Sequence, residues 1–297
     1  MYKIKQQPED FIVNEMIDLD ISPGPYLYCE IEKRNWNTMS LAKKLAKELR
    51  IKEKEVGFAG SKDKKAVTTQ FFSFLKVSKD MISKLQIPDV KIKVLGYGKE
   101  RLSLGDLKAN KFIITIRNLD KVFKGVVTEM KNYFGEQRFG VEGKNHIIGK
   151  LLLQNKFKEA CEELNLDIKN NDYIGALRKF SKKELLLYLH AYQSWLWNIK
   201  ARDIPSGKLE LVGFLTETNV YDDLLAEDGL TRRSFILRPM PELAVEGAER
   251  KVIVEVKDFQ VVETSDDEIF FGKNKQVLKF TLPKGCYATM LLKQLYG

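Results

Sequence analysis

The sequence predicts an α+β fold whose sheet is mainly antiparallel or mixed. Segments with strand patterns dominate the first 120 residues and return near the C-terminus, whereas the middle of the chain has helical patterns. Strands and helices do not alternate regularly, which argues against a parallel sheet of strand–helix–strand units. With 297 residues, 44% of them hydrophobic, the chain can bury a large core, in two domains or in one domain with an insertion.

Most of the predicted strands lie in the first half of the chain. Residues 10–16 alternate apolar and polar side chains, and residues 26–33 are rich in aromatic and β-type residues, so each is predicted to be a strand. The turn sequence SPGP at 22–25 predicts that these two strands form a hairpin. Further strands are predicted at 66–75, 90–97 and 111–117.

Helical patterns mark four parts of the chain. An amphipathic helix is predicted at 38–50, with Asn37 or Thr38 as its cap, and helices are also predicted at 122–134, in short pieces over 143–200, and at 286–296. Ser181 and Glu184 form a capping box at the start of a helix that runs to residue 200. Strands are predicted again at 234–237, 251–263 and 277–282, which is consistent with a helical middle inserted into one sheet domain.

The composition argues against several kinds of chemistry. Three scattered cysteines predict no disulfide framework, and two histidines with so few cysteines predict no structural zinc site. No segment fits a dinucleotide-binding or phosphate-binding loop. There is no spanning apolar segment and no apolar signal core at the N-terminus, so we expect a cytoplasmic protein. Any catalysis is expected to use carboxylates, lysines or aromatic groups, with no cofactor and no metal.

Positive charge is concentrated in the first half of the chain. The net charge is +9; residues 1–140 carry 27 basic and 18 acidic side chains, and the remaining residues carry 23 of each. Such an asymmetry predicts a polyanionic partner such as nucleic acid. A lysine-rich composition is also typical of thermophile proteins, so charge alone leaves both interpretations open.

The segment GFAGSKDKKAVTTQ (57–70) contains one carboxylate, Asp63, among three lysines. Nearby positive charge favours the ionised carboxylate, and a loop at the mouth of a buried strand is typical of catalytic positions. A solvated, charged turn explains the same local composition.

Other segments combine aromatic and polar residues. NYFGEQRFG (132–140) has the aromatic, amide and arginine groups that hold unstacked RNA bases, although some of its aromatic residues also fit a hydrophobic core. Taken alone, PEDFIVNE (8–15), YQSWLWN (192–198) and LPKGCYATMLL (282–292) fit packing roles.

Together with RLSLGDLKANKF (101–112), these segments resemble, in order, the motifs of the TruD family of tRNA pseudouridine synthases, from about residue 5 to residue 293. The resemblance implies the pseudouridine synthase fold, a mixed and mostly antiparallel sheet flanked by helices. It implies a catalytic domain of residues 1–140 and 231–297 and a mostly helical inserted domain of residues 141–230. That insertion is reduced, because only about 34 residues separate Trp197 from Arg232.

The resemblance also implies an isomerase that converts a uridine of tRNA to pseudouridine without a cofactor. Asp63 is then the catalytic carboxylate, which either attacks C1′ of the ribose or removes a neighbouring sugar proton. The substrate-contacting residues implied by the motifs are Phe11, Asn132, Tyr287, Phe134, Lys62 and Lys5.

The RNA target stays open at this stage. The usual bacterial-type target is uridine 13 of tRNA, and relatives outside bacteria modify other tRNA positions and other RNAs. An RNA-binding or RNA-folding protein without catalysis on the same scaffold is the first alternative, and the intact Asp63 motif argues against it. A metabolic enzyme unrelated to RNA is the second. No exposed apolar stripe predicts an oligomer, so a monomer is expected.

Overall fold

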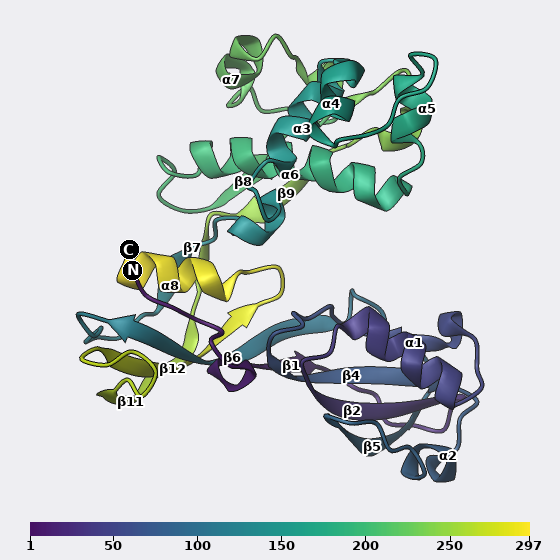
Figure 1. Ribbon diagram of the computed structural model, residues 1–297, viewed down its shortest axis with the longest axis vertical. Coiled ribbons are helices and arrows are strands. Elements are labelled where there is room, and N and C mark those ends of the chain that lie inside the picture. Colours follow the sequence, from purple (N-terminus) through teal and green to yellow (C-terminus); the bar gives the residue numbers. More distant parts are fainter. The chain divides into compact units, whose positions relative to one another are not determined.

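The computed structural model describes all residues from 1 to 297, which divide into two compact units (Figure 1). Unit 1 contains residues 1–130, 255–288 and 292–297, and unit 2 contains residues 131–254 and 289–291. Unit 2 is therefore inserted in the sequence of unit 1. The domain limits expected at 140 and 231 both fall within unit 2. No helix has both the length and the apolar character needed to cross a lipid bilayer.

Unit 1 is built on an eight-stranded sheet of order β11-β12-β6-β1-β4-β2-β5, with β3 paired to β4. Only the β1–β4 pair is parallel, so the sheet is mixed and mostly antiparallel, as the sequence predicts. The strands are β1 (Phe11–Ile17), β2 (Tyr26–Arg34), β3 (Val56–Phe58), β4 (Val67–Leu75), β5 (Val90–Gly98), β6 (Leu107–Leu119), β11 (Lys257–Asp266) and β12 (Asn274–Pro283).

The predicted hairpin of β1 and β2 is wrong. Strand β4 lies between them and pairs in parallel with β1 and antiparallel with β2. The turn sequence at 22–25 reverses the chain locally, but it does not determine which strands become neighbours. Phe72 and Phe74 of β4 are fully buried, so the insertion of this strand gives the centre of the sheet its hydrophobic core.

The helix α1 (Thr38–Glu48) covers β2 and β4 (Figure 1). It begins where the sequence predicts, because Asn37 Oδ1 accepts hydrogen bonds from the backbone N–H groups of Met39 and Ser40. Leu41 and Leu45 are fully buried against the sheet. The remaining helical segments of unit 1 are η1 (Pro8–Asp10), η2 (Glu53–Glu55), α2 (Lys79–Ser83) and most of α8 (Ala288–Tyr296), whose residues 289–291 belong to unit 2.

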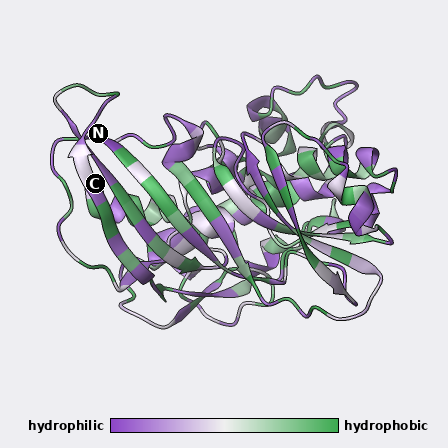
Figure 2. Ribbon diagram, turned by 90° about the horizontal axis from the view of Figure 1, so that it is seen from below, coloured by the Kyte–Doolittle hydropathy of each residue, from purple (hydrophilic) through white to green (hydrophobic).

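Alternating side chains give the sheet two different faces. Hydrophobic and hydrophilic residues alternate along several of its strands (Figure 2). In β1 the side chains of Phe11, Val13 and Glu15 are buried on one face, while Ile12 and Asn14 are only partly buried. Glu15 therefore lies on the same face as two hydrophobic core residues.

Unit 2 is mostly helical, as predicted for the middle of the chain. Its long helix α6 begins at the predicted capping box of Ser181 and Glu184, and α3 packs against it (Figure 1). Gly149 allows this close approach, because a Cβ there would lie 2.1 Å from the carbonyl oxygen of Tyr188. The helices are α3 (Asn145–Leu153), α4 (Phe157–Glu163), α5 (Tyr173–Leu177), α6 (Lys182–Lys200) and α7 (Asp222–Glu227), with 3₁₀ turns η3 (Glu136–Phe139), η4 (Arg232–Phe235) and η5 (Pro241–Leu243).

Three local predictions differ from the structure. The helix predicted at 122–134 is absent, since three β-branched residues at 126–128 disfavour a helix and β7 (Glu129–Lys131) follows them. The strand predicted at 234–237 is absent; its first two residues belong to the turn η4, which buries Phe235. The strand predicted at 251–263 is divided among β9 (Ala248–Lys251), β10 (Ile253–Glu255) and β11; β10 pairs with β7, and β9 with β8 (Lys208–Leu211).

Candidate active site

Asp63 lies in the loop between β3 and β4, and two polar side chains hold that loop in place. Thr38, the first residue of α1, accepts a hydrogen bond from the backbone N–H of Lys62 at 3.0 Å and donates one to Gln70 Oε1 at 2.9 Å. The amide of Gln70, in β4, donates to the carbonyl oxygen of Gly60 at 2.7 Å. The loop is thus held by the helix α1 through Thr38 and by the strand β4 through Gln70, which restricts the directions in which the Asp63 side chain can point.

The side chain of Lys62 turns toward the sheet and forms a buried ion pair with Glu15. Lys62 Nζ lies 2.5 Å from Glu15 Oε1, and the two side chains are 9% and 0% exposed. The second carboxylate oxygen of Glu15 accepts a hydrogen bond from the backbone N–H of Phe71 at 3.1 Å. Lys62 therefore anchors the loop that carries Asp63. A contact between Lys62 and the substrate stays a prediction.

Three of the predicted residues lie together. The ammonium group of Lys5 forms an ion pair with Asp63 and lies 4.2 Å from the centre of the Phe11 ring. The side chains of Lys5 and Asp63 are 23% and 31% exposed, so a substrate can reach both of them. Lys5 has a positive φ of 55°, a conformation that is uncommon for a residue other than glycine.

A buried aspartate holds the backbone next to Lys5. Asp10 Oδ2 accepts hydrogen bonds from the backbone N–H groups of Gln6 and Gln7 at 3.0 and 3.1 Å. The guanidinium group of Arg117, in β6, donates to Asp10 at 2.9 Å. Asp10 and Arg117 are both almost fully buried, so the N-terminal segment is fastened to the centre of the sheet. Neither residue was predicted to belong to the site.

Strand register places a further polar side chain, Asn110, on the face of the sheet that carries Glu15. Glu15 of β1, Asn110 of β6 and Leu282 of β12 occupy one row across the sheet. Asn110 Oδ1 is buried and has no hydrogen-bond partner, which is uncommon in a folded protein. Tyr287 follows the end of β12 and is half-buried at the cap of α8. Tyr287, whose contact with substrate is a prediction, therefore follows the end of β12 that lies in the same row as Glu15 and Asn110.

Lys33 adds an unusual positive charge to this region. Its side chain is fully buried in β2, and its ammonium group donates to the carbonyl oxygen of Trp36 at 2.5 Å. Burial, together with the charge of Lys62, lowers the pKa of Lys33 to about 8, although Asp63 and Glu15 oppose the shift. The charges of three loop and strand residues thus act on one buried amine.

Asn132 and Phe134 belong to unit 2 and form a second cluster there. Asn132 is buried, and its amide N–H donates to the carbonyl oxygen of Lys251 at 3.0 Å. Arg250 donates to the backbone oxygen of Asn132 at 2.9 Å and to its side-chain oxygen at 2.6 Å. Asn132 therefore fixes the orientation of a guanidinium group.

Phe134 is held by the helix α6. Its backbone N–H donates to Asn198 Oδ1 at 2.9 Å, and its carbonyl oxygen accepts from Asn198 Nδ2 at 3.0 Å. The Phe134 ring meets the Trp197 ring edge to face at 5.6 Å, and the guanidinium carbon of Arg250 lies 4.0 Å from its centre. The polar edge of the segment YQSWLWN thus positions the segment NYFGEQRFG.

Sequence reasoning missed the partners of the predicted residues more often than the residues themselves. Glu15 carried a usable signal, because a glutamate two positions after Val13 on an alternating strand must lie on the buried face. Arg117 and Arg250 carried none, since their roles depend on pairing with residues more than 100 positions away.

Comparisons with known proteins agree with these motifs. The family model described as tRNA pseudouridine synthase D (TruD) matches residues 2–170 and 211–295. The chain is 30% identical over 406 residues to the "Probable tRNA pseudouridine synthase D" of Methanosarcina acetivorans, covering 98% of this chain and 92% of that protein. It is 26% identical to the tRNA pseudouridine synthase D of Aquifex aeolicus, covering 99% and 98% of the two chains.

The fold also matches a solved structure. A crystal structure from Methanosarcina mazei, described as a TruD protein, superposes with a TM-score of 0.77 at 25% identity, covering 99% of this chain and 93% of that chain. The alignment with the Methanosarcina acetivorans protein runs over 406 residues, whereas this chain has 297, so at least 109 of its positions have no counterpart here. The family model leaves residues 171–210, within unit 2, unmatched.

Proposed function

The chain belongs to the TruD family of tRNA pseudouridine synthases, and we propose that it converts a uridine of tRNA to pseudouridine with Asp63 as its catalytic carboxylate. The observation that carries this proposal is the fixed position of Asp63, on a loop tied to α1, β1 and β4, with Lys5 and the Phe11 ring beside it. A solvated turn would not need such anchoring.

The reaction needs no external reactant. The bond between N1 of uracil and C1′ breaks, the base turns over, C5 bonds to C1′, and the proton lost from C5 is replaced by one at N1. A carboxylate assists either by attacking C1′ or by removing a neighbouring sugar proton. Asp63 is exposed enough for either role, and the ammonium group of Lys5 compensates its negative charge between turnovers.

The other motif residues receive roles that fit their surroundings. Phe11 is buried, so its ring acts by supporting the ammonium group of Lys5 beside Asp63, and Lys5 and Tyr287 lie in the same unit as Phe11. Lys62 acts on the substrate through the loop it anchors to Glu15. Asn132 and Phe134 act through the arginine they orient, because both are nearly buried.

The units support an assignment of domains. We assign the catalytic domain to unit 1 and the inserted domain to unit 2, with limits near residues 130 and 255. The positions missing from this chain relative to its longer relatives support a reduced insertion. Uridine 13 is the proposed target, because it is the usual target of the bacterial-type enzymes of this family. We also propose that the protein works in the cytoplasm as a monomer without a metal.

Conversion of unmodified tRNA transcripts, mapped at single-nucleotide resolution, tests the function. We expect pseudouridine at one position, and a rate at least about 10³-fold lower in Asp63→Asn with tRNA affinity unchanged within about threefold. Asp18→Asn, at an exposed aspartate just after β1, serves as the control with normal activity.

Each other outcome has a definite meaning. Binding without conversion by the wild-type protein would favour an RNA-binding protein that lacks catalysis. Conversion at a position other than 13 would keep the chemistry and replace the target. Absence of any salt-dependent tRNA binding would favour an enzyme unrelated to RNA.

A further inference from the structure

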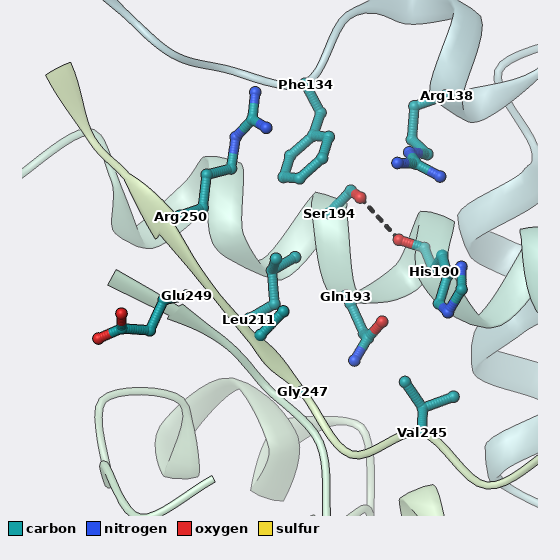
Figure 3. A pocket seen from close by; sticks show the side chains of 11 residues that line it. Phe134, Arg138, His190, Gln193, Ser194, Leu211, Val245, Gly247, Glu249 and Arg250 are labelled. Carbon is teal, nitrogen blue, oxygen red and sulfur yellow. Dashed lines mark hydrogen bonds between the residues drawn. The ribbon is translucent and has the colours of Figure 1, made fainter. Parts of the chain in front are cut away.

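Unit 2 contains a cavity of about 310 Å³, lined in part by Phe134 and Arg250, to which the proposed reaction assigns no ligand (Figure 3). Its walls come from the segment NYFGEQRFG, from one face of α6, and from the strands β8 and β9 with the residues just before β9. This volume lies in the range of pockets that bind small organic groups. We call it the Arg138 pocket.

One wall of the Arg138 pocket carries positive charge that is not neutralised. Figure 3 shows the Phe134 ring between the side chains of Arg250 and Arg138, and the guanidinium carbon of Arg138 lies 5.3 Å from the centre of that ring. Arg138 forms no ion pair, and its Nε is buried without a hydrogen-bond partner. The acid that lines the pocket, Glu249, points away from Arg138 in Figure 3 and pairs with Lys208 at 2.6 Å. The pocket therefore favours an anion next to Arg138.

The rest of the Arg138 pocket suits a flat ring with polar edges. Leu211 and Val245 give it apolar walls. The amide N–H of Gln193 donates to the carbonyl oxygen of Val212, which leaves the side-chain oxygen of Gln193 as an acceptor. Burial and the charge of Arg138 lower the pKa of His190, so a neutral imidazole faces the pocket. Apolar walls with a few fixed polar groups are what a nucleobase requires.

The charged surface continues beyond the Arg138 pocket. A second cavity shares Arg138 and His190 with it and is also lined by Lys182, Lys183 and Leu186. Lys183, Leu186 and His190 are spaced three and four positions apart on α6 and share one face of the helix, and Lys182 lies beside Lys183 at the edge of that face. Lys182 and Lys183 are exposed and form no ion pair. A chain of phosphates could follow this face from Arg138 to the start of α6.

We propose that the Arg138 pocket binds one nucleotide of the RNA substrate other than the target uridine. The base lies against Leu211 and Val245, its phosphate lies on Arg138, and neighbouring phosphates lie along Lys182 and Lys183. The inference rests on the proposed function, which supplies the RNA. The pocket is assigned to a nucleotide other than the target uridine because its one carboxylate, Glu249, is paired with Lys208 and turned away in Figure 3, so the pocket offers no carboxylate to a reacting ribose.

Abasic scanning of the tRNA tests this proposal directly. Each nucleotide in turn loses its base, and affinity is measured with Asp63→Asn, which binds without reacting. We expect one position other than the target uridine at which the loss of the base weakens binding about fivefold or more. Introducing Arg138→Gln or Ala248→Phe should abolish the penalty at that position, because the first removes the charge and the second fills the pocket from an exposed strand position.

The charge also predicts a salt effect. Arg138→Gln should lower the affinity for intact tRNA about five- to tenfold and reduce the slope of log affinity against log salt by about one. The double variant Lys182→Gln/Lys183→Gln changes only exposed side chains, so it tests the same face without risk to the core. Arg178→Gln, an exposed arginine of unit 2 that pairs with Glu242, is the matched control and should change neither quantity.

Three results would overturn the proposal: no position other than the target shows a penalty, the penalty persists in both pocket variants, or only the target position responds to them. Failure of the proposed function gives a different result, the absence of pseudouridine with wild-type protein. Because every pocket measurement is a binding measurement, it can be read whether or not conversion occurs.

Discussion

The two units fix their motif residues by different physical means. In unit 1 the Asp63 loop has a charged anchor, the buried pair of Lys62 and Glu15, in addition to its hydrogen bonds with Thr38 and Gln70. In unit 2 the segment around Phe134 is anchored by a neutral side chain, the amide of Asn198, which bonds both backbone groups of Phe134. The hydrogen bonds of a neutral amide do not depend on pH. A buried charge, in contrast, destabilises the fold when its oppositely charged partner is removed.

This difference follows from what each cluster must do. A reacting carboxylate such as Asp63 lies among positive groups that can meet a negatively charged substrate, and such groups need their own partners once they are buried. The segment around Phe134 has to present arginines to an anion, so its scaffold works best when it is neutral. We therefore expect substitutions in unit 1 to affect stability and rate together, and those in unit 2 to act mainly on RNA binding.

The largest effect is expected for Glu15→Gln. The change leaves the ammonium group of Lys62, whose side chain is 9% exposed, without its carboxylate, and loss of one partner of a buried pair costs about 3–5 kcal/mol. Urea unfolding at pH 7 measures the loss. Glu32→Gln, which removes the partner of the exposed Lys91, should leave the urea midpoint close to that of wild type.

A compensating variant sharpens this prediction. Glu15→Leu combined with Lys62→Met removes both charges and should recover most of the lost stability, since apolar side chains can replace a buried ion pair. Its rate of pseudouridine formation should stay low, because the loop then lacks its charged anchor and keeps only the hydrogen bonds with Thr38 and Gln70. A stable double variant with normal activity would show that the pair does not position Asp63.

The sequence predicted the parts of unit 1 that depend on local pattern. The strands, the Asn37 cap of α1 and the mixed sheet are confirmed, because alternation and capping are visible within a few residues. The neighbours of β1 were wrong, because strand pairing depends on β4, more than 50 residues away. Arg117 went unassigned for the same reason, and although alternation along β1 indicated that Glu15 is buried, its partner Lys62 depends on the register of the sheet.

In unit 2 the capping box at Ser181 is confirmed, while the contacts that hold Phe134 were not predictable. Asn198 lies 64 positions from Phe134, and Arg250 lies 118 positions from Asn132. The pair of Asn198 with Phe134 requires the packed position of α6, and the pair of Arg250 with Asn132 requires that of β9. The motif match identified Asn132 and Phe134 as candidate site residues, whereas their partners had to come from the structure.

The next largest effect concerns Lys33 and pH. Its pKa is about 8 in the folded protein against 10.5 when exposed, so between these values the unfolded chain holds more protons and this lysine makes stability rise with pH. The variant Lys33→Met has no ionisable group at this position, so this rise of its stability with pH is absent. The stability of the variant relative to wild type should fall by up to about 3 kcal/mol between pH 8 and pH 10.5.

Guanidinium unfolding at several pH values between 7 and 10.5 measures this change. Lys93→Met, at an exposed position of β5, should give a difference from wild type that varies little with pH. An equally flat profile for Lys33→Met would mean that Lys33 is neutralised differently, and that the charges of Lys62, Asp63 and Glu15 do not act on it as the structure implies.

The smallest effect is expected for Asn198→Ala, which tests the neutral anchor of unit 2. Removing the amide deletes two hydrogen bonds to the backbone of Phe134 and should cost about 1–2 kcal/mol in urea unfolding. Phe134 lies between two guanidinium groups, so its displacement should weaken tRNA binding severalfold. The rate at saturating tRNA should stay within about threefold of wild type, unlike that of Glu15→Gln.

The exposed Asn219 supplies the control, since Asn219→Ala should change neither stability nor binding. Comparing kcat with KM for Asn198→Ala and Glu15→Gln then separates the two anchors. If Asn198→Ala lowered kcat as strongly as Glu15→Gln and left the affinity for tRNA intact, the Phe134 segment would support the reaction itself. The division of labour between a charged anchor for chemistry and a neutral anchor for binding would then be wrong.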